Sequence, residues 1–300
     1  MSTRRGEMRA SDYWRSQDEQ FWAYVRVLSE RRGYAKRGAD SVAVYSLAEC
    51  RATLRELDRD PTVLDETDLG TRLVDYFQYR AHELNDVARN NLLEAHEAED
   101  LFNDIVRQCC TGATELYDRN RVLVAVEYEV RGGMSVRVPM NKQKGVKRAP
   151  SFLTGMVNIL FSYELGGETF EDDPRRLPVV DRDGELYAAM SRRLDGAYPS
   201  SVNPRALWEI KEYYYTTTFG SKISDAVYIS QLDGHERHEI VEATGLPIDL
   251  YLFVDAYGTW WSKGKAYLCR LVDAVNKGVV DEIVVGKECV EAIPRLVSSW

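Results

Sequence analysis

The spacing of apolar residues divides the chain into two parts. Up to about residue 118, apolar residues recur every three or four positions, as Leu73, Tyr76 and Phe77 do, which is the pattern of amphipathic helices. From residue 121 onward the apolar residues alternate or form β-branched runs, a pattern that favours strands. The sequence therefore predicts a mostly helical N-terminal domain over residues 1–118, followed by a region that contains strands.

Residues 119–149 are interpreted as a connecting segment. RVLVAVEYEV and MSVRVPM, separated by RGG, predict a β-hairpin over residues 121–140. Residues 131–163 contain six Lys or Arg and no acidic residue. Such a run is either a solvated loop or, beside a site that handles phosphates, a clamp on a nucleic-acid backbone. The candidate clamp residues are Lys142, Lys144, Lys147 and Arg148.

Residues 150–300 alternate between helical and strand patterns. The run SFLTGMVNILFSYEL predicts an apolar helix capped by Ser151. The whole order is helix–strand–strand–strand–helix–strand–helix–strand, which predicts a single mixed sheet flanked by helices, an α/β (α+β) fold. The expected strands are RRLPVVD, ELYAAMSRRLDGAY, ALWEIKEYYYTT, IDLYLFVDA and VVDEIVVG.

Charge is distributed unevenly. The net charge of −9 on its own argues against nucleic-acid binding. However, residues 49–107 hold fifteen acidic residues against seven arginines, so most of the excess lies in the predicted helices. That surface is either a solvated bundle face or an acidic docking surface. Residues 4–37 are basic and rich in aromatic residues, which suits either a nucleic-acid-facing arm or helices packed on the bundle.

Cysteine usage and hydropathy address the cellular compartment. The five cysteines are odd in number and belong to no C-x-x-C or His/Cys cluster, which disfavours a disulfide framework and a zinc site. We expect a reducing, cytoplasmic location. No run of 18 apolar residues occurs, so no membrane partner is expected.

The strand ALWEIKEYYYTT carries the candidate chemistry. Side chains alternate along a strand, so Glu209 and Lys211 share one face while Trp208 and Ile210 share the other. Two opposite charges on so apolar a strand would be costly merely to bury, and this favours a functional role. The alternative is a surface hairpin with a Glu209–Lys211 ion pair of little energetic value.

Asp195 lies fourteen residues before Glu209, at the end of the preceding predicted strand. If the two strands form a hairpin, the two carboxylates converge at one end of the sheet. Two carboxylates and a backbone carbonyl are oxygen ligands that Mg²⁺ prefers. Lys211 beside them would stabilise the charge that develops on a reacting phosphate. This combination is suited to phosphodiester hydrolysis.

Asp195 followed by Glu209-x-Lys211, after an apolar helix and before another helix, resembles the PD-(D/E)xK superfamily of restriction-endonuclease-like nucleases. The resemblance covers residues 151–285. It implies an αβββαβ core over residues 150–300, with Asp195 and Glu209 as metal ligands. It also implies that Ile210 lends its carbonyl and that Lys211 is the catalytic lysine.

The resemblance extends to further positions. It implies an acidic residue on the first helix, for which Glu164 is the candidate, and a glutamine on the helix after the third strand, for which Gln231 is the candidate. No proline precedes Asp195, and Asp181 is a rival first ligand. At the predicted start of the following helix, backbone N–H groups could bind a phosphate, with Ser221 and Lys222 as candidates.

These features predict an Mg²⁺-dependent endonuclease, with Mn²⁺ as a substitute, that cleaves double-stranded DNA as a homodimer. Restriction or phage defence is the use that the resemblance implies. The alternatives are DNA repair or processing, RNA cleavage on the same core, and a non-catalytic DNA-binding protein on a nuclease-like scaffold. The sequence leaves open any recognition sequence and the role of the acidic helical domain.

Overall fold

A four-stranded mixed sheet organises the C-terminal part of the protein. The structure, a computed structural model, describes residues 8–9, 11–35, 39–141, 149–215 and 221–300. The sheet has the order β6-β7-β8-β9, with β6 antiparallel to β7 and the other pairs parallel. Parallel neighbours require crossover connections, which the helices α9 and α11 provide. The strands are β6 (Gly196–Tyr198), β7 (Ala206–Glu212), β8 (Asp249–Asp255) and β9 (Glu282–Val285).

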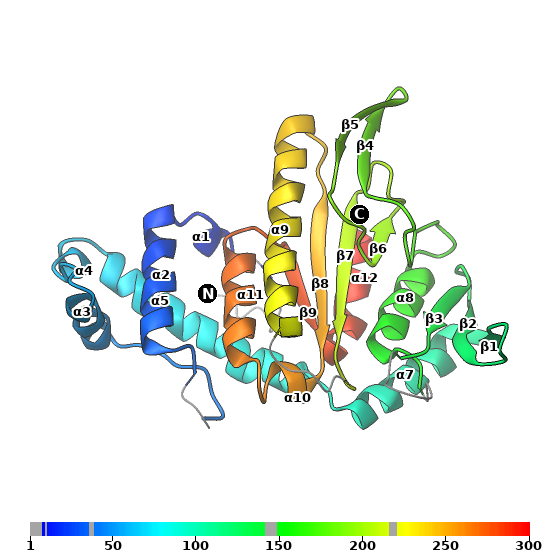
Figure 1. Cartoon of the computed structure of the whole chain (residues 1–300), viewed down its shortest axis with the longest axis horizontal. Helices are drawn as coiled ribbons and strands as arrows, with labels where there is room; N and C mark the ends of the chain where they lie inside the picture. The colour runs from blue at the N-terminus through cyan, green and yellow to red at the C-terminus, as the bar shows by residue number, and fades with distance from the viewer. Residues whose placement is uncertain (1–7, 10, 36–38, 142–148, 216–220) are drawn as a thin grey trace.

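Helices cover both faces of this sheet, which confirms the predicted mixed α/β class (Figure 1). One face is covered by α9 (Ser221–Thr244) and α11 (Lys265–Asn276), and the other by α8 (Phe152–Glu164) and α12 (Cys289–Ser299). Strand β7 contributes side chains to the cores on both faces of the sheet, because successive side chains point to opposite faces. Leu207 joins the apolar core beneath α9 and α11, and Trp208 joins the core beneath α8.

A second sheet, β1-β2-β3, packs beside α8 and α7 (Ala95–Cys109). The predicted hairpin is confirmed, because β2 (Leu123–Val130) pairs antiparallel with β3 (Val136–Pro139). Strand β1 (Cys110–Tyr117) was not predicted, since CTGATELY is mostly polar and exposed. It follows α7 directly and pairs with β2, so the expected boundary between residues 118 and 119 falls in the turn between two paired strands.

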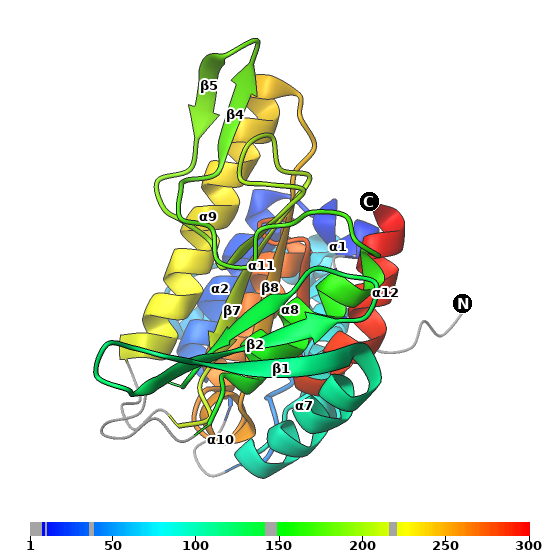
Figure 2. The ribbon, with the colours of Figure 1, turned by 90° about the vertical axis from the view of Figure 1, so that its right-hand side faces the viewer.

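The prediction of a single sheet is wrong for two strands. Strands β4 (Val179–Arg182) and β5 (Glu185–Ala189) form a separate two-stranded sheet that projects beyond the helices (Figure 2). Leu186 and Tyr187 are 67% and 56% exposed, so these two residues cover no core, whereas Ala188 packs against the core beneath α9 and α11. The strand predicted over ELYAAMSRRLDGAY is therefore broken between Ala189 and Gly196, and this break places Arg192 in a loop.

The N-terminal part is helical and has its own aromatic core. Trp14, Phe21 and Trp22 are buried against Tyr76, so these aromatic residues pack on the bundle and are not presented as an exposed arm. No described helix has the length and apolar character needed to cross a membrane. The helices are α1 (Asp12–Arg15), α2 (Glu19–Arg32), α3 (Leu47–Glu56), α4 (Val63–Glu66), α5 (Leu69–His82), the π-helix η1 (Glu83–Ala88) and α6 (Arg89–Asn91).

A buried ion pair joins the helical part to the sheet-containing part. Arg80 of α5 is fully buried and donates two hydrogen bonds, of 3.1 and 3.2 Å, to the carboxylate of Asp273 on α11. The hydroxyl of Tyr76 donates to the same carboxylate at 2.6 Å, and Arg80 also donates to the Ser29 hydroxyl at 3.1 Å. The pair is therefore extensively hydrogen-bonded, as a buried pair must be to be tolerated.

Glu83, at the start of η1, is a buried acid of a different kind. It is 7% exposed, and its Oε2 atom has no hydrogen-bond partner. Burial raises the pKa of Glu83 to about 7, and the nearby His82 opposes this only in part. The folded state therefore favours the protonated carboxyl more than the unfolded state does.

Because the folded pKa exceeds the unfolded one, the stabilisation associated with protonated Glu83 is present below about pH 4.5 and is lost as the pH rises through 7. We expect Glu83→Gln to remove a decline in unfolding free energy of up to about 3 kcal/mol between pH 5 and pH 8. Urea denaturation of both proteins at several pH values measures this. The exposed neighbour Asp86→Asn is the control, and equal slopes for wild type and Glu83→Gln would refute the expectation.

Candidate active site

Asp195 and strand β7 meet at one end of the β6–β7 hairpin. Gly196 pairs with Trp208 and Ala197 with Leu207, so the register continues to Asp195 opposite Glu209. Asp195 is an exposed residue, but its Oδ2 atom turns back to accept a 2.8 Å hydrogen bond from the Ile210 N–H. The predicted convergence of Asp195 and Glu209 is thereby present in the fold.

Glycine at position 196 allows the backbone of β6 to lie close to the indole ring of Trp208 on β7. A Cβ atom at Gly196 would lie 2.0 Å from the indole ring of Trp208, so any side chain larger than hydrogen would displace that ring. Trp208 in turn stacks on Phe161 of α8, with ring centroids 4.5 Å apart. The aromatic layer lies on one face of the hairpin, and because side chains alternate, Glu209 and Lys211 lie on the other.

Glu209 and Lys211 form a buried ion pair beneath α9. Glu209 is 6% exposed, and the ammonium group of Lys211 donates to its Oε1 atom. Next along the chain, Tyr213 lies close to both acids: burial raises its pKa to about 12, with further contributions from the charges of Glu209 and Asp195. The surface-hairpin alternative is therefore wrong, because the pair lies inside the fold.

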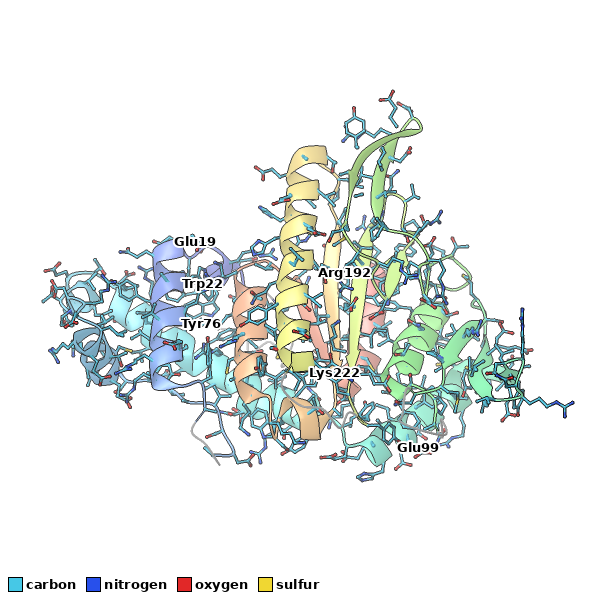
Figure 3. All side chains as sticks on the ribbon, in the orientation of Figure 1. Glu19, Trp22, Tyr76, Glu99, Arg192 and Lys222 are labelled. Carbon is cyan, nitrogen blue, oxygen red and sulfur yellow. The ribbon has the colours of Figure 1, made fainter. Side chains whose placement is uncertain are left out.

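Two charged residues that sequence reasoning missed complete the cluster. Arg192, in the loop after β5, donates two hydrogen bonds of 2.7 Å to the carboxylate of Asp233 on α9. Its Nη2 atom also lies 2.9 Å from Oε2 of Glu209. Figure 3 labels Arg192 between α9 and the sheet. The site thus contains three carboxylates, from Asp195, Glu209 and Asp233, and two cations.

The charges perturb one another. Although Asp195 is exposed as a residue, its carboxylate turns toward the protein, and desolvation together with repulsion from Glu209 raises its pKa to about 6. Burial raises the pKa of Asp233, although its bonds with Arg192 oppose the shift. Burial alone would lower the pKa of Arg192, but its hydrogen bonds to Asp233 and the charge of Glu209 outweigh burial and raise it. Two carboxylates that repel each other favour a cation between them.

A second pair of acids, Glu212 and Asp255, lies at the ends of β7 and β8 and has a structural role. Glu212 accepts hydrogen bonds from the N–H groups of Phe152 and Thr154, at 3.0 and 3.2 Å, and so caps α8. Asp255, its register partner on β8, accepts from the Leu93 N–H at 2.9 Å and from the Tyr214 hydroxyl. Burial raises the pKa of Glu212 to about 7, yet these partners occupy both carboxylates.

The structure places the remaining predicted site residues apart from this cluster. Glu164 ends α8, which covers the Trp208 face, and its charge acts on Cys109, so the structure does not bring Glu164 to this cluster. Gln231 lies two residues before Asp233 and hence about 200° around α9, so its side chain leaves the helix on a different side from that of Asp233. The rival Asp181 accepts a hydrogen bond from Gly184 in the β4–β5 turn.

The structure describes only some of the predicted phosphate-binding residues. Lys222 is exposed in the first turn of α9, at the lower end of that helix in Figure 3, and its carbonyl accepts a 3.5 Å hydrogen bond from Tyr213. Ser221 begins α9, but its side chain lies outside the described part of the structure. The basic candidates Lys142, Lys144, Lys147 and Arg148 also lie outside the described residues.

The donor set suits a metal ion that binds few protein ligands. Oε2 of Glu209 is buried and makes no hydrogen bond, so it has a lone pair to offer. Within the described ranges, no group of three or more His, Cys, Asp or Glu side chains is arranged to hold a metal. Asp195 and Glu209 could supply carboxylate oxygens to a metal ion there, with the Ile210 carbonyl as a further oxygen, and such an ion would keep several waters.

Comparison with known proteins matches two successive parts of the chain to family models. No curated protein and no solved structure matches the chain. Residues 8–87, the helical part, match the family model described as domain of unknown function DUF7690. Residues 93–300 match the model described as domain of unknown function DUF7687. The chain therefore belongs to the DUF7687 family, and its candidate site lies wholly within the matched residues.

Proposed function

We propose that the protein is a metal-dependent nuclease that hydrolyses phosphodiester bonds of DNA. The observation that carries the proposal is the convergence of Asp195, Glu209 and Lys211 at one end of the β6–β7 hairpin. Asp195 and Glu209 would hold Mg²⁺ or Mn²⁺, with the Ile210 carbonyl. A metal bound there would polarise a phosphoryl oxygen and lower the pKa of a bound water.

The chain's own residues would supply positioning and charge. Lys211 is held by Glu209 within the cluster, so its ammonium group can stabilise negative charge that develops on the phosphate. With three carboxylates and two cations, the cluster carries one net negative charge in its fully ionised form. A divalent cation would make it positive, which would suit it to an anionic phosphodiester.

The order of elements supports the finer fold assignment. Helix α8, the β6–β7 hairpin, crossover helix α9 and the parallel strand β8 follow the order of the PD-(D/E)xK core. Glu171 forms an antiparallel bridge with Ala197 on β6, in the place of a further strand. We accordingly propose a restriction-endonuclease-like core. Action as a homodimer, and use in restriction or phage defence, rest on the resemblance alone.

The test is incubation of the full chain with supercoiled plasmid in the presence of Mg²⁺, Mn²⁺ or EDTA. We expect nicked and then linear DNA with either metal and intact plasmid with EDTA. Linear duplex, single-stranded DNA and RNA as parallel substrates identify the form that is cut. Cleavage of RNA alone would replace DNA as the substrate, and binding of DNA without cleavage of any substrate would support the non-catalytic alternative.

A further inference from the structure

Arg192 connects Glu209 to an anchor outside the candidate ligand set. Its Nε and Nη2 atoms each donate to one oxygen of Asp233, and Nη1 donates to the Arg193 carbonyl at 3.0 Å. The side chain of Asp233 is 2% exposed, so this anchor lies inside the protein. Arg192 thus remains bound by Asp233 whether or not it contacts Glu209.

The Glu209 carboxylate needs a cation at each oxygen. Burying a carboxylate without a partner is strongly unfavourable, and in this structure Lys211 contacts Oε1 while Arg192 lies beside Oε2. Arg192 approaches Oε2 without the geometry of a hydrogen bond, whereas both of its bonds to Asp233 are well formed. Its contact with Glu209 is therefore the weaker of the two and the easier to give up.

We propose that Arg192 is an internal counter-ion for Glu209, which a divalent cation must displace from Oε2 in order to bind. The inference rests on the proposed metal site. Asp233 makes the displacement possible, because it keeps the guanidinium group paired after Glu209 is released to the metal. Arg192 and Asp233 are thus positioning residues that set the metal affinity of the site.

The test is titration of the purified full-length protein with Mn²⁺, followed by calorimetry. Arg192→Gln removes the competing cation, and we expect it to bind Mn²⁺ about tenfold more tightly than wild type. Asp233→Asn leaves Arg192 with Glu209 as its main partner, so we expect binding several-fold weaker than wild type. Damage to the fold would weaken binding in both variants, so the opposite signs distinguish the proposal from a structural role.

Two control variants distinguish the effect of the Arg192–Glu209 contact on Mn²⁺ affinity from the effect of removing any nearby positive charge. Arg193→Gln removes an equal charge at the adjacent, exposed position and should bind Mn²⁺ within about twofold of wild type. Arg192→Lys keeps the charge but loses the fork that spans Asp233 and Glu209, and we expect it to bind more tightly than wild type. Circular dichroism of each variant checks the fold.

Each outcome has a definite meaning. If folded Arg192→Gln binds Mn²⁺ no more tightly than wild type, while Glu209→Gln abolishes binding, the counter-ion proposal is overturned and the metal site stands. If Arg193→Gln gains as much affinity as Arg192→Gln, the effect is general charge and the proposal is again overturned. If neither wild type nor any variant binds Mn²⁺, the proposed metal-dependent function itself fails.

Discussion

Replacing Asp195 by Asn is expected to lower metal-dependent DNA cleavage by about 100- to 1,000-fold while the protein stays folded. Asp195 is exposed, and its carboxylate accepts one hydrogen bond, from the Ile210 N–H, which the Asn carbonyl oxygen can still accept. The substitution therefore removes one negative charge from the proposed metal site and little else. Initial rates of plasmid cleavage in Mg²⁺, with thermal unfolding as a check of the fold, measure the effect.

Asp181→Asn is the matched control for this substitution. Asp181 is the rival acid in the sequence, but it caps the β4–β5 turn and lies on a separate hairpin. We expect cleavage by Asp181→Asn within about threefold of wild type, since a surface substitution away from the site has small effects. Wild-type activity in Asp195→Asn together with loss of activity in Asp181→Asn would reverse the assignment.

Lys211→Ala should be as inactive as Asp195→Asn, because it removes the charge that would stabilise the reacting phosphate.

Asp273→Ala is expected to destabilise the protein by about 3–5 kcal/mol. The substitution leaves the guanidinium group of Arg80 without its carboxylate partner at a position with no solvent exposure. It also removes the acceptor of the Tyr76 hydroxyl. Since Arg80 and Tyr76 belong to α5 and Asp273 to α11, the loss weakens the junction between the two family-matched segments. Urea denaturation followed by circular dichroism measures the change.

The control for this prediction is a surface ion pair that connects the same two parts of the molecule. Glu19 of α2 pairs with Lys277, directly after α11, at 2.9 Å, and the Glu19 side chain is 80% exposed. Because exposed pairs contribute little, Glu19→Ala should cost less than about 1 kcal/mol. Similar losses from Asp273→Ala and Glu19→Ala would show that burial of the Arg80 pair does not set the strength of this junction.

Much of the candidate site was predictable because it depends on a short local pattern. Strand alternation alone places Glu209 and Lys211 on one face and Trp208 on the other, and the structure confirms this. The connection between β6 and β7 is short enough that antiparallel pairing of the two strands sets the register of Asp195 against Glu209. The helix at residue 152 and the strand at residue 249 were predictable for a similar reason, since long apolar runs have few other stable arrangements.

The errors arose where a local pattern was compatible with two environments. Strand β5 has apolar residues at Leu186 and Tyr187, yet they are exposed, because β5 pairs only with β4 and it is Ala188 that faces the core beneath α9 and α11. Glu164 lies at a plausible place in the sequence order, but α8 packs on the face of the sheet opposite to Glu209. Sequence order specifies which elements follow one another, but the face of the sheet that each covers depends on packing.

Arg192 and Asp233 show the same limit at the site itself. They are 41 residues apart, and no spacing rule links a loop arginine to an aspartate in the middle of a helix. A weak signal was available, since Ala226, Ser230, Asp233 and Arg237 follow the helical repeat of the buried face of α9. That signal marks Asp233 as buried and in need of a cation, but it does not say which cation.

Residues close together in the chain were enough to predict most of the secondary-structure order of the C-terminal part, apart from the break between β5 and β6. They were also enough to predict the alternation along β7 and the Asp195–Glu209–Lys211 triplet. The packing of the folded chain was needed to show that Arg192 and Asp233 join the triplet, that Glu164 does not, and that Arg80 and Asp273 connect the helical part to the sheet. The physical reason is that buried charges must find partners, and those partners are brought together by the packing of distant elements.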